Sequence, residues 1–286
     1  MRAASPGRST FVTAALVLLC GLLPARAQDA SAWQQDAHAA ARLIAGTPVN
    51  TPHGSILRAG IEIRLDPGWK TYWRYPGDSG VPPSFDFAGS QNVKSATVEW
   101  PAPEQFSDDA GGHSIGYRGD VVLPLQVVPM DPSRPSNLSL KLNYAICGTL
   151  CVPAHAILDL PLTGASADEA ILDTAEQSVP KRVALGPNRG NDLAIISVRR
   201  EAGGKHGRVV VDVAAPSGAP VTLFAEGPTP EWALPLPEPD GPQAGPTRRF
   251  IFDLDGLPPG AQVTGAALTL TAVSGSDAIE VPARLD

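Results

Sequence analysis

The chain has 286 residues, of which 43% are hydrophobic, and a formal net charge of -7 at pH 7. This length suits two domains of roughly 100 to 150 residues, with enough apolar side chains for ordinary cores. The excess of acids argues against nucleic acid as a partner. There is no glycine loop of the kind that binds phosphate and no nucleophile-elbow sequence, so no cofactor is expected and a hydrolase is disfavoured.

The first 27 residues have the features of an export signal. Arg2 and Arg8 give a positive start, Phe11 to Leu23 an apolar stretch, and Ala25-Arg26-Ala27 a cleavage site. The apolar stretch is shorter than the roughly 20 residues that a membrane-spanning helix needs. We therefore expect a mature periplasmic chain that starts near Gln28, has a formal charge of about -10 and is not inserted in the membrane.

The next part of the chain predicts a β-sandwich, assigned to residues 28–165. Proline and glycine, 30 and 28 residues, separate short runs of alternating or β-branched residues, which is typical of all-β proteins. The expected strands are Ser55 to Leu65, Ser95 to Trp100, Asp120 to Val128, Ser139 to Ile146 and His155 to Leu162. Residues 139 to 145 alternate with period two, which predicts one buried and one exposed face.

A change of period at residue 166 predicts a linker with one helix over residues 166–188. Apolar residues recur at helical spacing up to Arg182, and Ser166 is the expected N-cap. Residues 189–286 are predicted to form a second β-sandwich. Its expected strands are Leu193 to Arg200, Arg208 to Val213, Val221 to Phe224, Arg248 to Leu254, Ala266 to Val273 and Ala278 to Arg284. The proline-rich stretch Glu226 to Pro246 is expected to be an irregular loop or a contact segment.

Removal of the signal would leave two cysteines, Cys147 and Cys151, in an oxidising compartment. An extended strand would hold them about 13 Å apart, whereas a disulfide needs roughly 4.4 to 6.8 Å between Cα atoms, so the chain must turn between them. Gly148 and Pro153 favour a turn at this point. A five-residue ring stabilises a fold by only about 2 kcal/mol in the chain-entropy model. The pair is therefore favoured as an exchanging disulfide over an inert staple, although the turn contains no cation and the nearest titratable neighbour in sequence is His155.

Several ordered motifs resemble the amino-terminal periplasmic domain of the DsbD and ScsB membrane reductases. The resemblance covers about residues 45 to 165. The motifs are Pro67-Gly68-Trp69-Lys70-Thr71-Tyr72-Trp73, Pro76-Gly77-Asp78-Ser79-Gly80, Trp100-Pro101-Ala102-Pro103, Gly116-Tyr117-Arg118-Gly119-Asp120 and Asn143 to Ala154, which contains both cysteines.

The resemblance implies an immunoglobulin-like sandwich that relays electrons through Cys147 and Cys151. The implied partners are periplasmic thioredoxin-like proteins and a membrane electron-carrying reductase. By analogy, Cys151 forms the mixed disulfide with a partner and Cys147 resolves it. Tyr117 and Tyr144 match family positions near the site, with an ordinary core role as the alternative.

Three departures from the DsbD pattern qualify the resemblance. Three residues separate the cysteines here, as in the ScsB-like branch, whereas DsbD has five. The stretch that matches the DsbD capping loop, Asp108 to His113, has no aromatic residue. Two alternatives follow: Phe106 or His113 shields the disulfide instead, or the disulfide is less protected than in DsbD. The sequence up to Asp286 shows no membrane-spanning or thioredoxin-like segment, which predicts a free-standing relay.

Two other functions stay open. A Cys-x-x-x-Cys pair near a histidine can bind Cu(I) through its thiolates, which would make this a copper-tolerance protein. The paired sandwiches could instead form a non-catalytic adaptor with a structural disulfide, in which the aromatic group Trp69, Tyr72 and Trp73 is either core or binding surface. No resident metal is expected under the preferred hypothesis.

Overall fold

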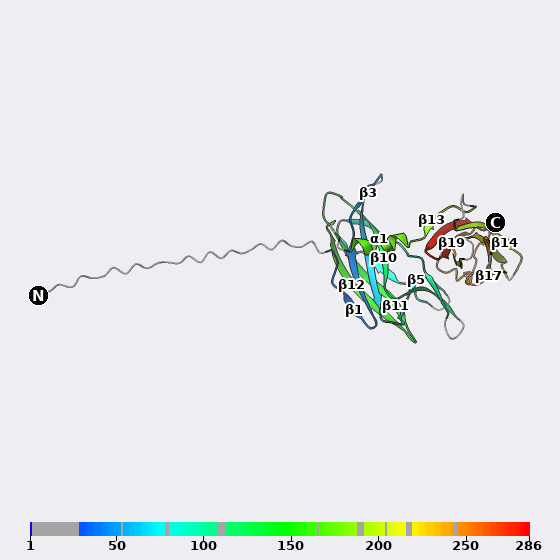
Figure 1. The fold of residues 1–286 in the computed structure, drawn as a ribbon, viewed down its shortest axis with the longest axis horizontal. Coiled ribbons are helices and arrows are strands. Elements are labelled where there is room, and N and C mark those ends of the chain that lie inside the picture. Colours follow the sequence, from blue (N-terminus) through cyan, green and yellow to red (C-terminus); the bar gives the residue numbers. More distant parts are fainter. Residues whose placement is uncertain are drawn as a thin grey trace.

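A computed structural model describes residue 1 and residues 29–52, 54–77, 80–107, 112–164, 166, 168–187, 192–203, 205–215, 219–242 and 245–286. The predicted export signal falls in residues 2–28, outside the described residues. The described chain is almost entirely β, with one α-helix, and its sheets form two β-sandwiches that lie side by side (Figure 1). The predicted all-β sandwich fold is thus confirmed. No helix in the described ranges has the length and apolar character to cross a membrane.

Two sheets form the first sandwich. The order in one sheet is β1 (Gln34–Asp36), β2 (Ala39–Ala45), β4 (Gly54–Leu65), β10 (Val121–Pro129) and β7 (Val93–Val98), with β3 (Val49–Thr51) paired to β4. The order in the other is β12 (Cys151–Leu162), β11 (Ser136–Cys147), β5 (Lys70–Gly77), β9 (His113–Arg118) and β8 (Glu104–Ser107), with β6 (Ser84–Asp86) paired to β11.

Two four-stranded sheets form the second sandwich. One has the order β13 (Lys181–Arg182), β20 (Asp277–Arg284), β19 (Ala267–Ser274) and β16 (Thr222–Glu226). The other has the order β14 (Ala194–Glu201), β15 (Arg208–Ala214), β18 (Thr247–Asp253) and β17 (Glu238–Pro239). Within the proline-rich stretch, Trp232 and Leu234 are buried in the core of this sandwich.

The helix α1 spans Glu169–Gln177, inside the predicted linker but shorter than predicted. The predicted N-cap Ser166 is wrong, because Asp168 holds the N-cap position and makes no side-chain capping hydrogen bond. The predicted end at Arg182 is also wrong. Pro180 cannot continue a helix, and Lys181 and Arg182 instead pair in parallel with β20 as strand β13. The domain boundaries at residues 165 and 189 stay predictions.

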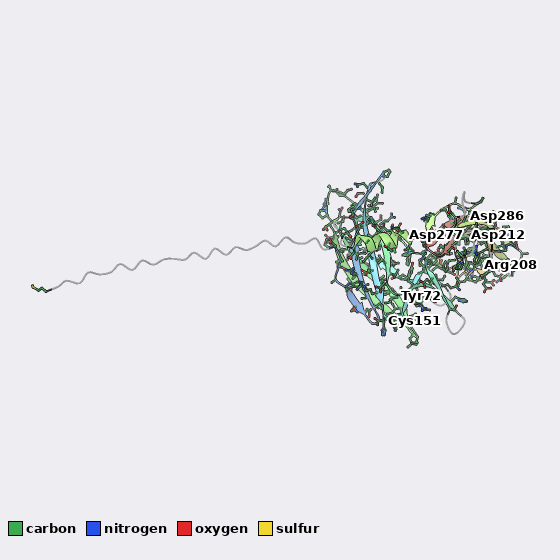
Figure 2. The ribbon with its side chains drawn as sticks, in the orientation of Figure 1. Tyr72, Cys151, Arg208, Asp212, Asp277 and Asp286 are labelled. Atoms are coloured by element: carbon green, nitrogen blue, oxygen red, sulfur yellow. A yellow bond between two sulfur atoms is a disulfide. The ribbon has the colours of Figure 1, made fainter. Side chains whose placement is uncertain are left out.

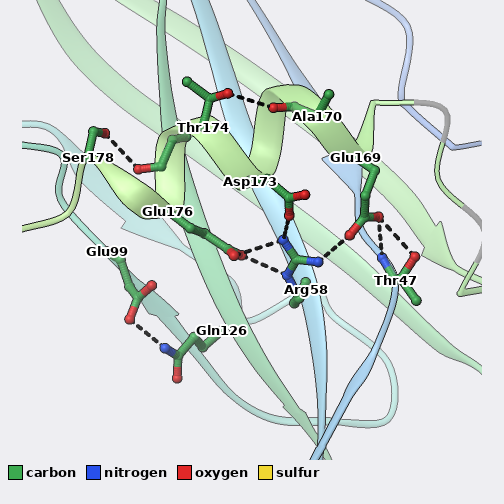
Figure 3. A network of polar contacts seen from close by, with 11 residues as sticks. Thr47, Arg58, Glu99, Gln126, Glu169, Ala170, Asp173, Thr174, Glu176 and Ser178 are labelled. Atoms are coloured by element: carbon green, nitrogen blue, oxygen red, sulfur yellow. Dashed lines mark hydrogen bonds and ion pairs between the residues drawn. The ribbon is translucent and has the colours of Figure 1, made fainter.

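Helix α1 is fixed to the first sandwich by one arginine of β4. The Arg58 guanidinium binds three carboxylates on one face of the helix, those of Glu169, Asp173 and Glu176 (Figure 3). Glu169 also accepts hydrogen bonds from the backbone N–H and hydroxyl of Thr47. The hydrogen bond to Glu176 is the largest cause that raises the pKa of Arg58, against the opposing effect of burial. The linker helix is therefore held on the outer face of β4 and β10.

The two cores meet at strand β16. Leu223 and Ala225 point into the second core, whereas Phe224 between them is fully buried in the core cluster of the first sandwich. The ring centroid of Phe224 lies 5.8 Å from that of Trp73 on β5. Alternation along one strand therefore places consecutive side chains in two different sandwiches.

Candidate functional site

The two cysteines lie at the tip of the hairpin formed by β11 and β12. Cys147 is the last residue of β11, Cys151 is the first residue of β12, and the two are directly paired across the ladder. They form a disulfide with their Cα atoms 4.1 Å apart. The backbone N–H of Gly148 donates to the carbonyl of Leu150, which closes the three-residue turn between them. The predicted strand-turn-strand arrangement is confirmed.

The two sulfur-bearing residues differ in their access to solvent. Cys147 is 2% exposed and belongs to a small buried cluster with Tyr72 and Ala145. Cys151 is exposed, and the neighbouring Leu150 at the tip is 74% exposed. An attacking thiolate must approach one sulfur along the S–S axis, so access favours attack at Cys151.

The hydroxyl of Tyr72 is the polar group of β5 that contacts the disulfide. Its oxygen lies 2.7 Å from the sulfur of Cys147 and 3.3 Å from that of Cys151. Tyr72 and Cys151 are next to each other in Figure 2. Burial raises the pKa of the Tyr72 hydroxyl above its ordinary value, so the group keeps its proton at neutral pH and can donate it in a hydrogen bond. A thiolate formed at Cys147 would therefore meet a hydrogen-bond donor.

Two glycines allow Tyr72 to reach this position. A side chain at Gly116 would place its Cβ 1.9 Å from the carbonyl oxygen of Thr71 and 2.9 Å from the Cα of Tyr72. A Cβ at Gly80 would lie 2.7 Å from the Tyr72 ring. The hydroxyl of Thr71 donates to the carbonyl of Ala145, which ties β5 to β11 beside Cys147. These glycines belong to the sequence motifs noted above, and their packing explains why those motifs contain glycine.

Trp69 lies beside the turn that joins the cysteines. A Cβ at Gly148 would approach the Trp69 ring to 3.2 Å, so the indole covers the backbone of the turn. The indole also stacks on the ring of His38, at a centroid distance of 4.0 Å, and packs against the first core. Trp69 and Tyr72 therefore border the disulfide, whereas Trp73 is part of the first core. Sequence reasoning treated these three aromatic residues as one group and did not assign Tyr72 to the sulfurs.

Three other residues considered from the sequence contact other parts of the first sandwich. The ring of His155 is hydrogen-bonded to Asn143 across the hairpin. The hydroxyl of Tyr117 donates to the carbonyl of Pro101. Tyr144 is 4% exposed in the first core, where its hydroxyl has no hydrogen-bond partner. Tyr117 and Tyr144 thus have the core role that the sequence left as the alternative.

The residues considered for shielding the disulfide are only partly described. Asp108 to Gly111 lie outside the described residues. Phe106 is buried, and the cationic groups of Lys70 and Arg118 lie 5.3 and 5.0 Å from its ring centroid. His113 is within hydrogen-bond distance of Ser107 and Gln105. In the part of the chain that the structure describes, no group of three or more His, Cys, Asp or Glu side chains has the geometry to hold a metal ion.

Comparison with known proteins finds a family match over the part of the chain that contains this site. Residues 40–162 match the family described as thiol:disulfide interchange protein DsbD, N-terminal. The fold is similar to the crystal structure of the N-terminal periplasmic domain of ScsB from Proteus mirabilis, with a TM-score of 0.69 and 24% sequence identity over 90% of this chain and 98% of that chain. The structural similarity thus extends beyond the DsbD match into the second sandwich. No curated protein sequence matches the chain significantly.

Proposed function

Because residues 40–162 form a DsbD-like and ScsB-like N-terminal domain, we propose that this chain is a periplasmic thiol:disulfide exchange protein that works through Cys147 and Cys151. The observation that carries the proposal is the hairpin-tip disulfide, with one exposed sulfur-bearing residue, one buried one, and a tyrosine hydroxyl at both sulfurs. This arrangement supplies an accessible site of attack and a hydrogen-bond donor for the leaving thiolate.

The proposed reaction exchanges one disulfide for another. A thiolate of a partner dithiol attacks the sulfur of Cys151, the Cys147–Cys151 bond breaks, and Cys147 leaves as a thiolate. The second thiolate of the partner then attacks the partner's first sulfur in the mixed disulfide, which forms the partner's disulfide and releases Cys151 as a thiolate. The partner loses two electrons and becomes a disulfide, and this chain gains them, with two protons from solvent, as a dithiol. In the reverse direction Cys147 resolves the mixed disulfide.

The proposed partners are periplasmic thioredoxin-like proteins and a membrane electron-carrying reductase. The DsbD-like domain supports this class of partner, since exchange proteins of this kind act on other thiol proteins. The exposed Leu150 next to Cys151 offers an apolar contact at the point where a partner sulfur would approach. Protein export to the periplasm by the segment of residues 1–27 is part of the same proposal.

Cysteine trapping tests this function. In a Cys147→Ser variant of the full chain, Cys151 can still form a mixed disulfide, and Cys147 is no longer present to resolve it, so thiol proteins of the periplasm should accumulate on Cys151. A Cys151→Ser variant leaves only the buried Cys147 and should trap at least about tenfold less, because a buried thiol is poorly accessible. A variant without both cysteines is the control for non-covalent capture.

The outcome also separates the proposal from its rivals. If neither single variant captures a thiol protein and glutathione buffers do not reduce the wild-type disulfide, the disulfide is structural, as the adaptor hypothesis requires. If the reduced chain instead binds Cu(I) one-to-one, loses that binding in either serine variant and traps no partner, the copper-binding hypothesis replaces ours.

A further inference from the structure

Strand β5 contacts both the disulfide and the second sandwich. Tyr72 places its hydroxyl at the two sulfurs. The next three residues all contact the second sandwich. Trp73 packs against Phe224, Arg74 pairs with Glu226 and Glu280, and the hydroxyl of Tyr75 donates to the carbonyl of Leu234. The residue that contacts the disulfide and the residues that contact the second sandwich are therefore neighbours in the chain.

The β-ladders pair β5 at its start and again at its last residue, Gly77. β5 pairs with β11 at Lys70 and Thr71, and with β9 from Lys70 to Tyr72. Its register with β9 then shifts, and pairing resumes at Gly77. Residues 73–76 thus form an arch between two paired positions. Because the ladder is interrupted there, side-chain contacts contribute to the position of these residues.

Arg74 makes the strongest polar contact of the arch. Its Nε and Nη2 atoms lie 2.7 to 3.2 Å from the carboxylate oxygens of Glu226, and Nη2 lies 2.6 Å from Glu280. The side chains of the two glutamates are only 17% and 18% exposed. The Arg74 guanidinium also lies over the Trp73 ring, 4.4 Å from its centroid. Paired charges with this little solvent contact are screened weakly and hold a fixed geometry.

We propose that Arg74 is a positioning residue through which the second sandwich keeps the Tyr72 hydroxyl at the disulfide. The second sandwich thereby helps to set the redox equilibrium of Cys147 and Cys151. This inference rests on the proposed exchange function. When two electrons reduce the disulfide, the Tyr72 O–H donates to the Cys147 thiolate and stabilises the reduced form, which raises the reduction potential. Loss of the Arg74 contact lets the arch move and weakens that hydrogen bond.

The test measures the equilibrium between the full-length chain and a dithiothreitol redox buffer at pH 7. Tyr72→Phe should make the disulfide about tenfold harder to reduce, which corresponds to about 30 mV for a two-electron couple. Arg74→Ala should shift the equilibrium in the same direction by about threefold. In the Tyr72→Phe background, Arg74→Ala should cause no further shift, since a residue that acts through Tyr72 has no effect without its hydroxyl.

Control variants keep the result interpretable. Arg249→Ala removes an arginine of the second sandwich that pairs with Asp212 and should leave the equilibrium unchanged. If Arg74→Ala does not fold, as judged by circular dichroism, the double variant Glu226→Gln and Glu280→Gln removes the same ion pairs with smaller changes of shape. Equal shifts with and without the Tyr72 hydroxyl, or no shift in a folded Arg74 variant, overturn the inference. Neither of these two results contradicts the exchange function, provided that the wild type still exchanges. The exchange function is contradicted by a different result, the failure of cysteine trapping.

Discussion

At the scale of single residues, the space around the disulfide depends on positions that lack a side chain. At Gly116 the backbone of β9 lies close to that of β5, beside Thr71 and Tyr72. A methyl group there meets a backbone carbonyl, which cannot move away without breaking the ladder. Gly148 at the turn differs, because the nearest atoms to a new Cβ belong to the Trp69 ring, at 3.2 to 3.4 Å.

Gly116→Ala should therefore destabilise the protein by about 3 kcal/mol, at the upper end of the range for overpacked sites. Gly148→Ala should cost less than about 1 kcal/mol, because a side-chain ring can shift by a few tenths of an ångström. Urea unfolding of the oxidised proteins measures both values. Equal stability of the two variants would mean that the contact between β5 and β9 is looser than the structure indicates.

Asp212 on β15 gives a residue-scale prediction about pH. Burial opposes its ionisation, but hydrogen bonds from Arg249, Arg199 and Ser197 outweigh it and lower the pKa of Asp212 to about 2. The pKa in the unfolded chain is about 3.9, so the folded state favours the charged form. The resulting stability is fully present above about pH 4 and is lost as the pH falls toward 2.

Asp212→Asn should remove this part of the acid sensitivity. The urea midpoint of the wild type should fall more steeply between pH 4 and pH 2 than that of the variant, and the two curves should converge at the acid end. Parallel curves over this range would show that folding does not favour the charged form of Asp212.

At the scale of elements, the hairpin of β11 and β12 presents the disulfide while its outer edge is already capped. The backbone N–H of His155 donates to the carboxylate of Asp36, and that of Ile157 donates to the side-chain oxygen of Gln34. Pro153 and Pro161 have no N–H to offer. These features protect the edge strand from pairing with another chain, while Leu150 and Cys151 at the tip stay exposed.

Helix α1 depends on Arg58 to stay on the first sandwich. The three carboxylates that Arg58 binds lie on one face of a nine-residue helix, and without the guanidinium they would repel one another beside Glu99. Burial is the largest cause that raises the pKa of Glu99, and the nearby charge of Glu176 adds to it. Arg58 therefore neutralises a group of acidic side chains that would otherwise repel one another on this surface.

Arg58→Ala should destabilise the protein by about 1 to 3 kcal/mol, the range for charged hydrogen bonds reduced by the partial exposure of the acids. Arg58→Lys should recover less than half of this loss, because an ammonium cannot serve three carboxylates in the planar geometry of a guanidinium. Hydrogen exchange of residues 169–177 should accelerate in both variants. Unchanged protection of the helix would show that contacts other than those of Arg58, such as the packing of Leu172, hold it.

Elements with a clear period were predictable from the sequence, and elements without one were not. The alternating run at residues 139–145 predicted β11, and the two cysteines predicted the hairpin tip. Strand β2 was missed because Ala39 to Ala45 is buried on both faces and shows no alternation. Strand β5 was missed because its register breaks after Tyr72, where long-range contacts with the second sandwich replace the ladder. The contact between Tyr72 and the sulfurs could not be predicted from local sequence patterns, because it joins residues that are 75 and 79 positions apart.

At the scale of the whole molecule, the two sandwiches share a buried side chain. Phe224 has no exposed surface and lies in the first core, although its strand belongs to the second sandwich. A ring of this size contributes roughly 3 to 5 kcal/mol when fully buried, so the link should make the two sandwiches unfold as one unit. The ion pairs of Arg74 add to the same interface.

Phe224→Ala should therefore destabilise the whole chain by about 3 kcal/mol and split its thermal unfolding into two transitions. Phe250→Ala is the matched control, because Phe250 is 2% exposed within the second core and does not reach the first. That variant should destabilise the second sandwich by a similar amount. Because Phe224 still links the two cores, the chain should continue to unfold in one transition. Calorimetry distinguishes the two cases. A single transition in Phe224→Ala, at a lower temperature than in the wild type, would show that the remaining interface, including Arg74, suffices to couple the sandwiches.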